Sequence, residues 1–143
     1  MKPNSEIVIG NAGSDFVMIR PGRGYSDEGW MTAAIQVQCD GWRGGFNTDF
    51  MRGELRRLSL ELQRLKDTLN GETRFVPLEH QLVLVFEGDG KGHIKVSGKA
   101  VNVHSSNTYL NFELELDQTY LENIIRRLEE ADPATRERAV DIS

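Results

Sequence analysis

The sequence predicts an α+β fold: an antiparallel β-sheet meander with two amphipathic helices packed on one face. Strand-like runs follow one another in the second half of the chain with only short connections, which leaves no helix for a parallel crossover. Apolar residues also recur at helical spacing in two separate segments. With 143 residues, the chain suits a single domain over 1–143, with a core over 6–131 and a C-terminal tail over 132–143.

The first elements are expected to be strands. Glu6–Ile9 and Asp15–Arg20 form a hairpin around the turn-forming segment GNAGS. Pro21–Gly29 contains several chain-breaking residues and is expected to be an exposed loop. The next strand covers Trp30–Asp40, where apolar and polar residues alternate.

A helix is expected to follow, beginning near Asp49, although Thr48 is also a suitable cap and Gly53 weakens the first turn. Its apolar stripe consists of leucines three or four positions apart: Leu55, Leu58, Leu62, Leu65 and Leu69. Asn70-Gly71 provides the stop. The stripe spans only about two heptads, so packing on the protein's own sheet is favoured over a coiled coil.

The sequence of the second half of the chain predicts four further strands, which lie within Thr73–Glu79, His80–Gly88, His93–His104 and Thr108–Leu116. Pro77 is expected to place the first of them at an edge or a bend, because proline cannot donate to a ladder. Leu82–Phe86 is apolar throughout, which indicates a central strand covered on both faces.

The last strand leads directly into a helix at Asp117. Alternation of apolar and polar residues changes there to helical spacing, in the run FELELDQTYLENIIRRL. A carboxylate at this position can accept hydrogen bonds from the first helical turn, so Asp117 is interpreted as a cap rather than a catalytic acid. Pro133 ends the helix.

Composition excludes several classes of protein. The only cysteine, Cys39, cannot form an internal disulfide, and no apolar run is long enough for a signal sequence or a membrane span, so we expect a cytoplasmic protein. The net charge is −5, and residues 71–143 hold thirteen acidic and eight basic groups. Nucleic acid is therefore a poor candidate partner and a basic protein a better one, although solubility alone also explains the charge.

No assembled catalytic or metal-binding chemistry is found. Asp89 and Gly92 fall near the offsets of a calcium loop, but Lys91 and Gly98 occupy two positions that need oxygen ligands, so a glycine-rich turn is the better interpretation. The three histidines, His80, His93 and His104, are too far apart for a recognised zinc motif. We therefore predict no enzyme, metal or cofactor, and we expect Cys39 to lie in the core.

The aromatic residues Trp30 and Trp42 flank the middle strand and are expected to pack in the core or at its rim. The candidate partner-binding residues are polar residues on the strand faces that are expected to be exposed to solvent: Asn111, Glu113, Glu115, Lys95, Lys99, Gln36 and Gln38.

Four segments together resemble the WapI-like immunity family: EGWMTAAIQVQCDGWRGGF, the leucine-rich helix, HQLVLVFEGDGKGHIKVSG and NFELELDQTYLENIIRRL. The resemblance covers Gly29–Leu128, and its most specific parts are GDGKGH at Gly88–His93 and DQTYL at Asp117–Leu121. It implies a small bacterial cytoplasmic protein that neutralises the C-terminal domain of a wall-associated, contact-dependent toxin by stoichiometric binding.

Two alternatives stay open. A small-molecule binder or enzyme would have a pocket between helix and sheet, with His93 or His104 as acid or base. A self-associating protein would pair its exposed strand edges as a homodimer, so the chain is expected to be a monomer or a homodimer.

Overall fold

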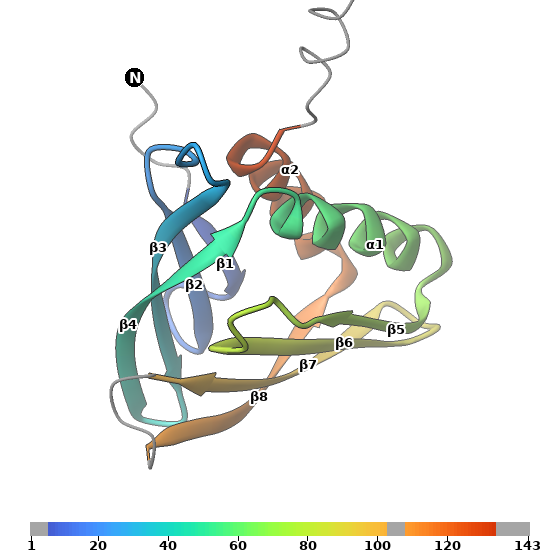
Figure 1. The fold of residues 1–143 in the computed structure, drawn as a ribbon. Helices are drawn as coiled ribbons and strands as arrows, with labels where there is room; N and C mark the ends of the chain where they lie inside the picture. The colour runs from blue at the N-terminus through green and yellow to red at the C-terminus, as the bar shows by residue number, and fades with distance from the viewer. Residues whose placement is uncertain (1–5, 103–107, 134–143) are drawn as a thin grey trace, which may run out of the picture.

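The strands form two antiparallel four-stranded sheets (Figure 1). The computed structural model describes residues 6–102 and 108–133 of the chain. The first sheet contains β1 (Ile7–Gly10), β2 (Phe16–Pro21), β3 (Trp30–Cys39) and β4 (Trp42–Met51) in that order. The second contains β5 (Asn70–Phe75), β6 (Leu82–Asp89), β7 (His93–Val101) and β8 (Tyr109–Asp117), also in that order.

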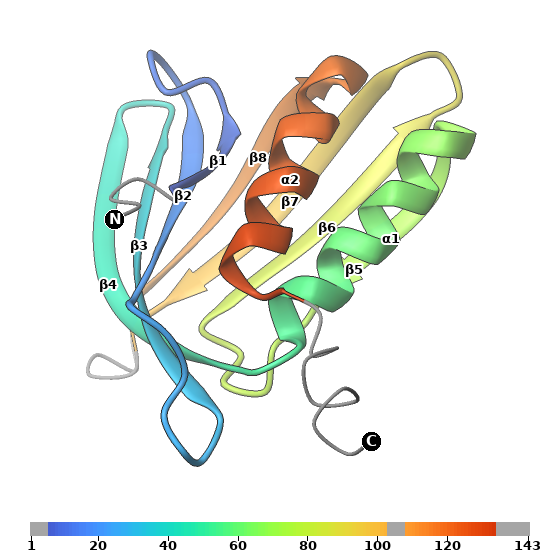
Figure 2. The same ribbon diagram turned by 90° about the horizontal axis from the view of Figure 1, so that it is seen from above.

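The α+β class and the antiparallel meander are confirmed, but the strands divide between two sheets where we expected one. The two helices are α1 (Glu54–Thr68) and α2 (Leu121–Ala131), and a short 3-10 turn over Gln118–Tyr120 precedes α2. Figure 1 shows the helix pair in the angle between the sheets, and Figure 2 shows α1 and α2 side by side. Packing on one face of a sheet is not confirmed, because α1 contacts β5 while α2 contacts β1.

The two apolar stripes form the helix side of the core. Four of the five leucines predicted to form the apolar stripe of α1 are buried: Leu55, Leu58, Leu62 and Leu65. The fifth, Leu69, adopts a left-handed conformation at the C-terminus of α1, and its amide donates to the carbonyl of Leu65. One continuous hydrophobic cluster joins these residues to α2 and both sheets. A single domain over residues 1–143 stays a prediction.

The predicted helix start near Asp49 is wrong, because residues up to Met51 form the strand β4. Asp40 and Gly41 have φ of 52° and 84° and turn the chain tightly between β3 and β4, as the pairing of Cys39 with Trp42 shows. The Asp-Gly pair is a hairpin signal, but Gly44-Gly45 interrupts the alternation that follows it. In the sequence, the residues after Gly41 therefore resembled a loop and not a strand.

Most of the remaining strand predictions are confirmed. The first hairpin forms β1 and β2. β5 is an edge strand that ends before Pro77, although it already begins at Asn70, which we expected to be part of the helix stop. β6 is an interior strand, but Val83 and Val85 on its second face are only half-buried.

The end of β8 differs in one detail from the capped helix that we predicted. Asp117 holds the N-terminal cap position of the 3-10 turn, but its carboxylate makes no capping hydrogen bond. The Gln118 amide donates instead to the carbonyl of Gly92, at 2.8 Å. α2 ends at Ala131, two residues before Pro133. Asp132, which we assigned to the tail, is buried, and residues 134–143 lie outside the described part.

Candidate protein-binding surface

Five of the predicted partner-binding residues lie together on the outer face of β7 and β8. The strand register pairs Lys95 with Glu115 and Lys99 with Asn111, and Glu113 lies between these pairs opposite Ser97. Residues of the opposite parity, such as Leu114, are buried. The alternation in the sequence therefore separated the outer face from the core correctly.

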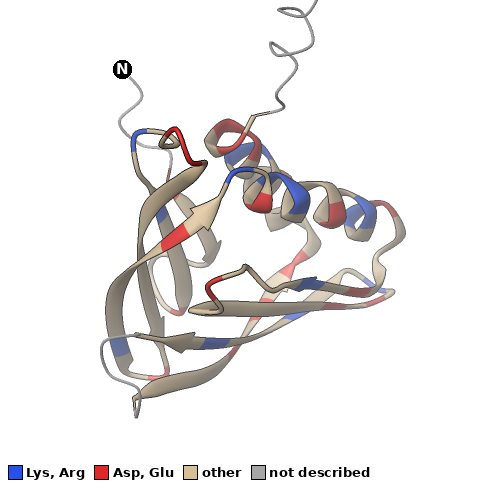
Figure 3. Ribbon diagram, viewed as in Figure 1, with Lys and Arg blue, Asp and Glu red and all other residues tan. Residues whose placement is uncertain are grey.

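Residues of both charge signs lie along β7 and β8 (Figure 3). The Lys95 ammonium lies 3.8 Å from a carboxylate oxygen of Glu87 and 3.9 Å from one of Glu113. Glu115 forms no ion pair with any described residue. Because Lys95 offsets part of the acidity, we do not expect this face to attract a basic partner as strongly as Glu113 and Glu115 alone would.

The other two predicted residues, Gln36 and Gln38, lie on the first sheet and not beside these five. Their parity places them on the outer face of β3, since the core-facing residues of that strand are Ile35 and Val37. The Gln38 amide nitrogen donates to the Ser14 carbonyl at 2.7 Å. The predicted set therefore falls on two separate faces, and its part in binding stays a prediction.

Trp42 is more exposed than the sequence predicted, and Tyr109 is exposed as well. Trp42 is 66% exposed and Tyr109 is 55% exposed. The Lys99 ammonium lies 4.7 Å from the centre of the Tyr109 ring, a cation–π contact that links this aromatic residue to the β7–β8 face. The expectation that Trp42 packs in the core or at its rim is wrong.

A groove of about 520 Å³ separates β4 from the adjoining ends of β7 and β8. Trp42 and Tyr109 line it together with the apolar side chains of Val37, Phe46 and Leu110. Trp, Tyr and Arg are the residues that most often carry the binding energy of protein interfaces, so exposed examples beside a groove mark a candidate binding surface.

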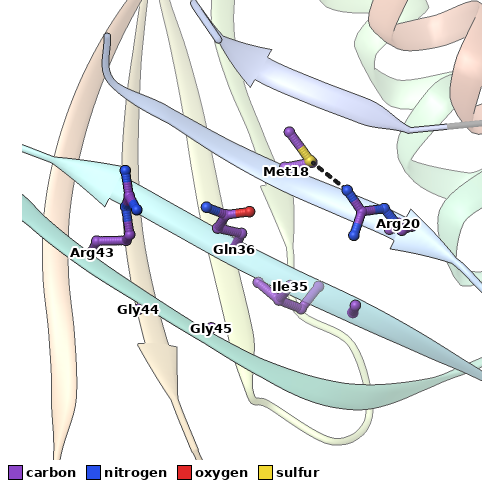
Figure 4. A pocket seen from close by; sticks show the side chains of 8 residues that line it. Met18, Arg20, Ile35, Gln36, Arg43, Gly44 and Gly45 are labelled. Atoms are coloured by element: carbon purple, nitrogen blue, oxygen red, sulfur yellow. Dashed lines mark hydrogen bonds between the residues drawn. The ribbon is translucent and has the colours of Figure 1, made fainter. Parts of the chain in front are cut away.

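A second hollow, of about 300 Å³, lies on the outer face of the first sheet (Figure 4). Arg20 of β2 and Arg43 of β4 flank it, and Gln36 lies between them on β3. The Arg43 guanidinium donates to the Gln38 side-chain oxygen at 3.1 and 3.2 Å. Both hollows are lined by Arg43, Gly44 and Gly45, so they meet at this segment of β4.

The glycine-rich turn between β6 and β7 is held by Asp89. Its carboxylate accepts hydrogen bonds from the amides of Lys91, at 2.6 Å, and His93, at 3.2 Å. The first of these bonds, aided by the His93 ring 3.0 Å away, lowers the pKa of Asp89 to about 2. The carboxylate is thus engaged in fixing the turn.

The remaining candidates for chemistry form no metal-binding cluster among the described residues. The His93 ring is exposed, His80 lies in a turn, and His104 falls outside the described residues. Cys39 is buried, as predicted, with its sulfur 3.3 Å from the carbonyl oxygen of Glu113. No three His, Cys, Asp or Glu side chains within residues 6–102 and 108–133 gather closely enough to hold a metal ion.

The helix side of the core is filled by side chains. The leucine stripe of α1 is buried, and neither the groove nor the outer hollow described above is lined by a residue of α1 or α2. No helix in the described part of the chain combines the length and the apolar character needed to cross a bilayer.

The two motifs that carry the family resemblance most specifically meet in space. Gln118, from the motif at Asp117–Leu121, bonds the backbone of Gly92, from the motif at Gly88–His93. A model described as the immunity protein WapI-like family matches residues 7–132 of the chain. The chain belongs to the WapI-like immunity protein family. No curated protein and no solved structure matches it significantly.

The WapI-like match extends further than the resemblance noted in the sequence. It begins in β1, so it includes the first hairpin, and it ends on the buried Asp132. Among the resemblance residues, Gln118 and Gly92 have a structural role, whereas Trp42 and Arg43 lie at the exposed edge of β4.

Proposed function

We propose that this WapI-like protein neutralises the toxic domain of a cognate contact-dependent toxin by stoichiometric binding, without catalysis. Membership of an immunity family supports a protein partner. The observation that carries the proposal is the exposure of Trp42 beside the groove, because a large aromatic side chain contributes most when a partner removes it from water.

The cytoplasm of the producing cell is the proposed location. Immunity is needed where the toxin would act, and the only cysteine is buried and needs no oxidising compartment.

The first test is affinity capture of the tagged protein from its own cells, with a mock capture for comparison and identification of the partners by mass spectrometry. The proposal expects one large secreted toxin, or its C-terminal fragment, in one-to-one ratio with the bait. Trp42→Ala should lose most of this partner. Leu60→Ala is the matched control, because Leu60 is a similarly exposed apolar residue on α1, at 54%.

Recovery of the bait alone, under conditions that retain known complexes, contradicts the proposal. Equal recovery with Trp42→Ala and with wild type would leave the function standing but remove Trp42 from the interface.

Charge reversal tests the predicted β8 residues separately. Glu113→Lys combined with Glu115→Lys should slow association with the captured toxin domain and weaken the salt dependence of its rate, if the partner surface is basic. The control is Glu129→Lys with Glu130→Lys, which changes the net charge equally on exposed positions of α2. Equal effects of the two pairs would mean that only net charge matters, and unchanged kinetics would remove Glu113 and Glu115 from the site.

A further inference from the structure

β4 is an edge strand of the first sheet, and no described strand pairs with its outer side. The tight turn at Asp40-Gly41 makes Cys39 and Trp42 its closing hydrogen-bonded pair, and such pairs alternate along an antiparallel ladder. The even-numbered residues of β4 therefore bond β3, and the odd-numbered residues direct their backbone N–H and C=O groups outward.

Two outward groups further along β4 agree with this alternation. The Asn47 carbonyl accepts a hydrogen bond from the Gln81 side chain at 3.5 Å, and the Met51 amide donates to Glu54 at 2.8 Å. A buried bond from Thr48 to Gln81, 2.7 Å long, joins the same part of β4 to the start of the second sheet. The second half of the edge is thus covered.

Within residues 6–102 and 108–133, nothing covers the first half of the edge. No described residue bonds the outward backbone groups of Arg43 or Gly45. Unpaired strand edges are usually protected by charge, proline or a bulge, because they accept a further strand readily. Here the protection is limited to the Arg43 side chain, followed by two glycines.

The two glycines also leave space on both faces of this edge. Gly44 lies opposite Val37 and faces the inner groove, whereas Gly45 lies opposite Gln36 and faces the outer hollow. A strand added along Arg43–Gly45 would direct alternate side chains into these two spaces. The inner groove is lined mainly by apolar side chains, and the outer hollow is flanked by Arg20 and Arg43.

The charge of Arg43 is available to a partner. Arg20 is paired with Glu6, but Arg43 bonds the neutral side chain of Gln38, and no described carboxylate lies within ion-pair distance of it. An acidic side chain in the outer hollow would therefore gain a charge-assisted hydrogen bond without breaking an existing ion pair.

We propose that an extended segment of the partner protein adds as a fifth strand to the edge of β4 at Arg43–Gly45, with apolar side chains in the inner groove and an acidic side chain facing Arg43. Backbone hydrogen bonds supply affinity in this mode of recognition, and the alternate side chains supply selectivity. The inference rests on the proposed binding function and specifies the surface and the chemistry of the bound segment.

The test uses synthetic peptides, so it does not depend on finding the toxin. An acetylated and amidated peptide of alternating valine and glutamate is titrated into the isotope-labelled full-length protein, and amide exchange is followed by NMR. We expect slower exchange at Arg43 and Gly45, with shifts at Trp42. A matched peptide with lysine for glutamate should bind about tenfold more weakly or worse, because it places a cation against Arg43.

A substitution in β4 provides the second measurement. Gly44→Val should fill the inner groove and weaken binding of the glutamate peptide by about tenfold or more. Apart from Gly44 itself and its two chain neighbours, no heavy atom of the described residues lies within 4 Å of a Cβ atom placed there, so the variant is expected to fold. Gly24→Val is the matched control, since Gly24 has equally open space but lies in the loop before β3.

Unchanged exchange at Arg43 and Gly45 with saturating glutamate peptide would overturn the inference, as would equal binding of the two peptides or of Gly44→Val and wild type. If the Arg43 and Gly45 amides exchange slowly without peptide and the protein has a dimeric mass in solution, the edge is occupied by a second copy of the chain, and the inference is also overturned. Toxin capture by Gly44→Val at wild-type yield would refute the edge while leaving the proposed function intact, whereas no capture by wild type would refute the function itself.

Discussion

The carboxylate of Asp132 accepts a hydrogen bond 2.8 Å long from the backbone amide of Gly53, which lies 79 residues earlier in the chain. The same oxygen accepts a second bond, 3.0 Å long, from the Arg56 amide. Gly53 occupies the cap position of α1 and has no side chain of its own to bond these amides. A buried residue beyond the end of α2 therefore supplies the cap and places a negative charge at the positive end of α1.

Asp132→Ala is expected to lower the free energy of unfolding by about 1–2 kcal/mol, because it leaves two amides of α1 without their acceptor. Asp132→Asn should cost less, since an amide oxygen can still accept. Urea denaturation at neutral pH measures both, with Glu130→Ala as an exposed control on α2. Losses no larger than that of the control would show that the cap contributes nothing.

Tyr25 is expected to make the fold sensitive to alkaline pH. Burial raises the pKa of its hydroxyl well above the ordinary value, and the nearby Asp132 carboxylate adds to the rise. A raised folded-state pKa means that the unfolded chain loses the proton first, so stability is lost as pH rises past about 10. Tyr25→Phe should reduce this loss between pH 9 and about 11 in denaturant titrations, and an identical pH profile for both proteins would contradict the assignment.

Gly98→Ala is expected to destabilise the second sheet. A Cβ atom at Gly98 would overlap the ring of its cross-strand neighbour Phe112, which is itself buried. Overpacking of this kind typically costs about 1–3 kcal/mol, and thermal and urea denaturation would measure it. Adding Phe112→Leu should recover part of the loss by making room for the methyl group. A neutral Gly98→Ala would indicate that the ring moves aside freely.

Asp89→Asn tests the turn between β6 and β7. The pKa of Asp89 is about 2, below its ordinary value, so its ionised form favours the folded state above pH 4 and this contribution disappears as pH falls towards 2. The variant should therefore be less stable than wild type at neutral pH, with a difference that shrinks in acid. A difference that is constant between pH 6 and about 2.5 would contradict this cause.

Cys39 is expected to be an unreactive thiol in the folded protein. Burial raises the pKa of its sulfur, and the Asp15 carboxylate raises it further, so little thiolate is present at neutral pH. A chromogenic disulfide reagent should modify it far more slowly in buffer than in urea. Similar rates in the two conditions would show that the contact between β3 and β8 opens readily.

Most individual helices and strands could be predicted from the sequence, because the spacing of apolar residues and the positions of glycine and proline are local properties. Leu55 to Leu65 and the alternation up to Asp117 identified α1 and β8 directly. β4 was not predicted because Gly44 and Gly45 have no side chains, so the alternation of apolar and polar residues typical of a strand is interrupted there. The division into two sheets could not be predicted either, since pairing between distant strands depends on tertiary contacts that no local pattern records.

The candidate site shows the same limit. Alternation placed Glu113 and Lys95 on an outer face, but it could not show that Gln36 belongs to a different sheet. Exposure of Trp42 depends on how β4 meets the ends of β7 and β8, which is a property of the assembled fold. The Gly44-Gly45 pair was the available signal, because two adjacent glycines in a strand often mark a place where another backbone approaches.

Because Asp132 lies 79 residues after Gly53, α1 is synthesised well before the residue that caps it. The first sheet and all of α1 leave the ribosome well before residue 132, and at roughly 5–20 residues per second this interval lasts about 3 to 13 seconds. During that time α1 has no acceptor from Asp132 for its first amides. The helix can reach its final capped state only after the second sheet and α2 have been made, so the N-terminal cap of α1 depends on a residue that follows the last helix of the fold.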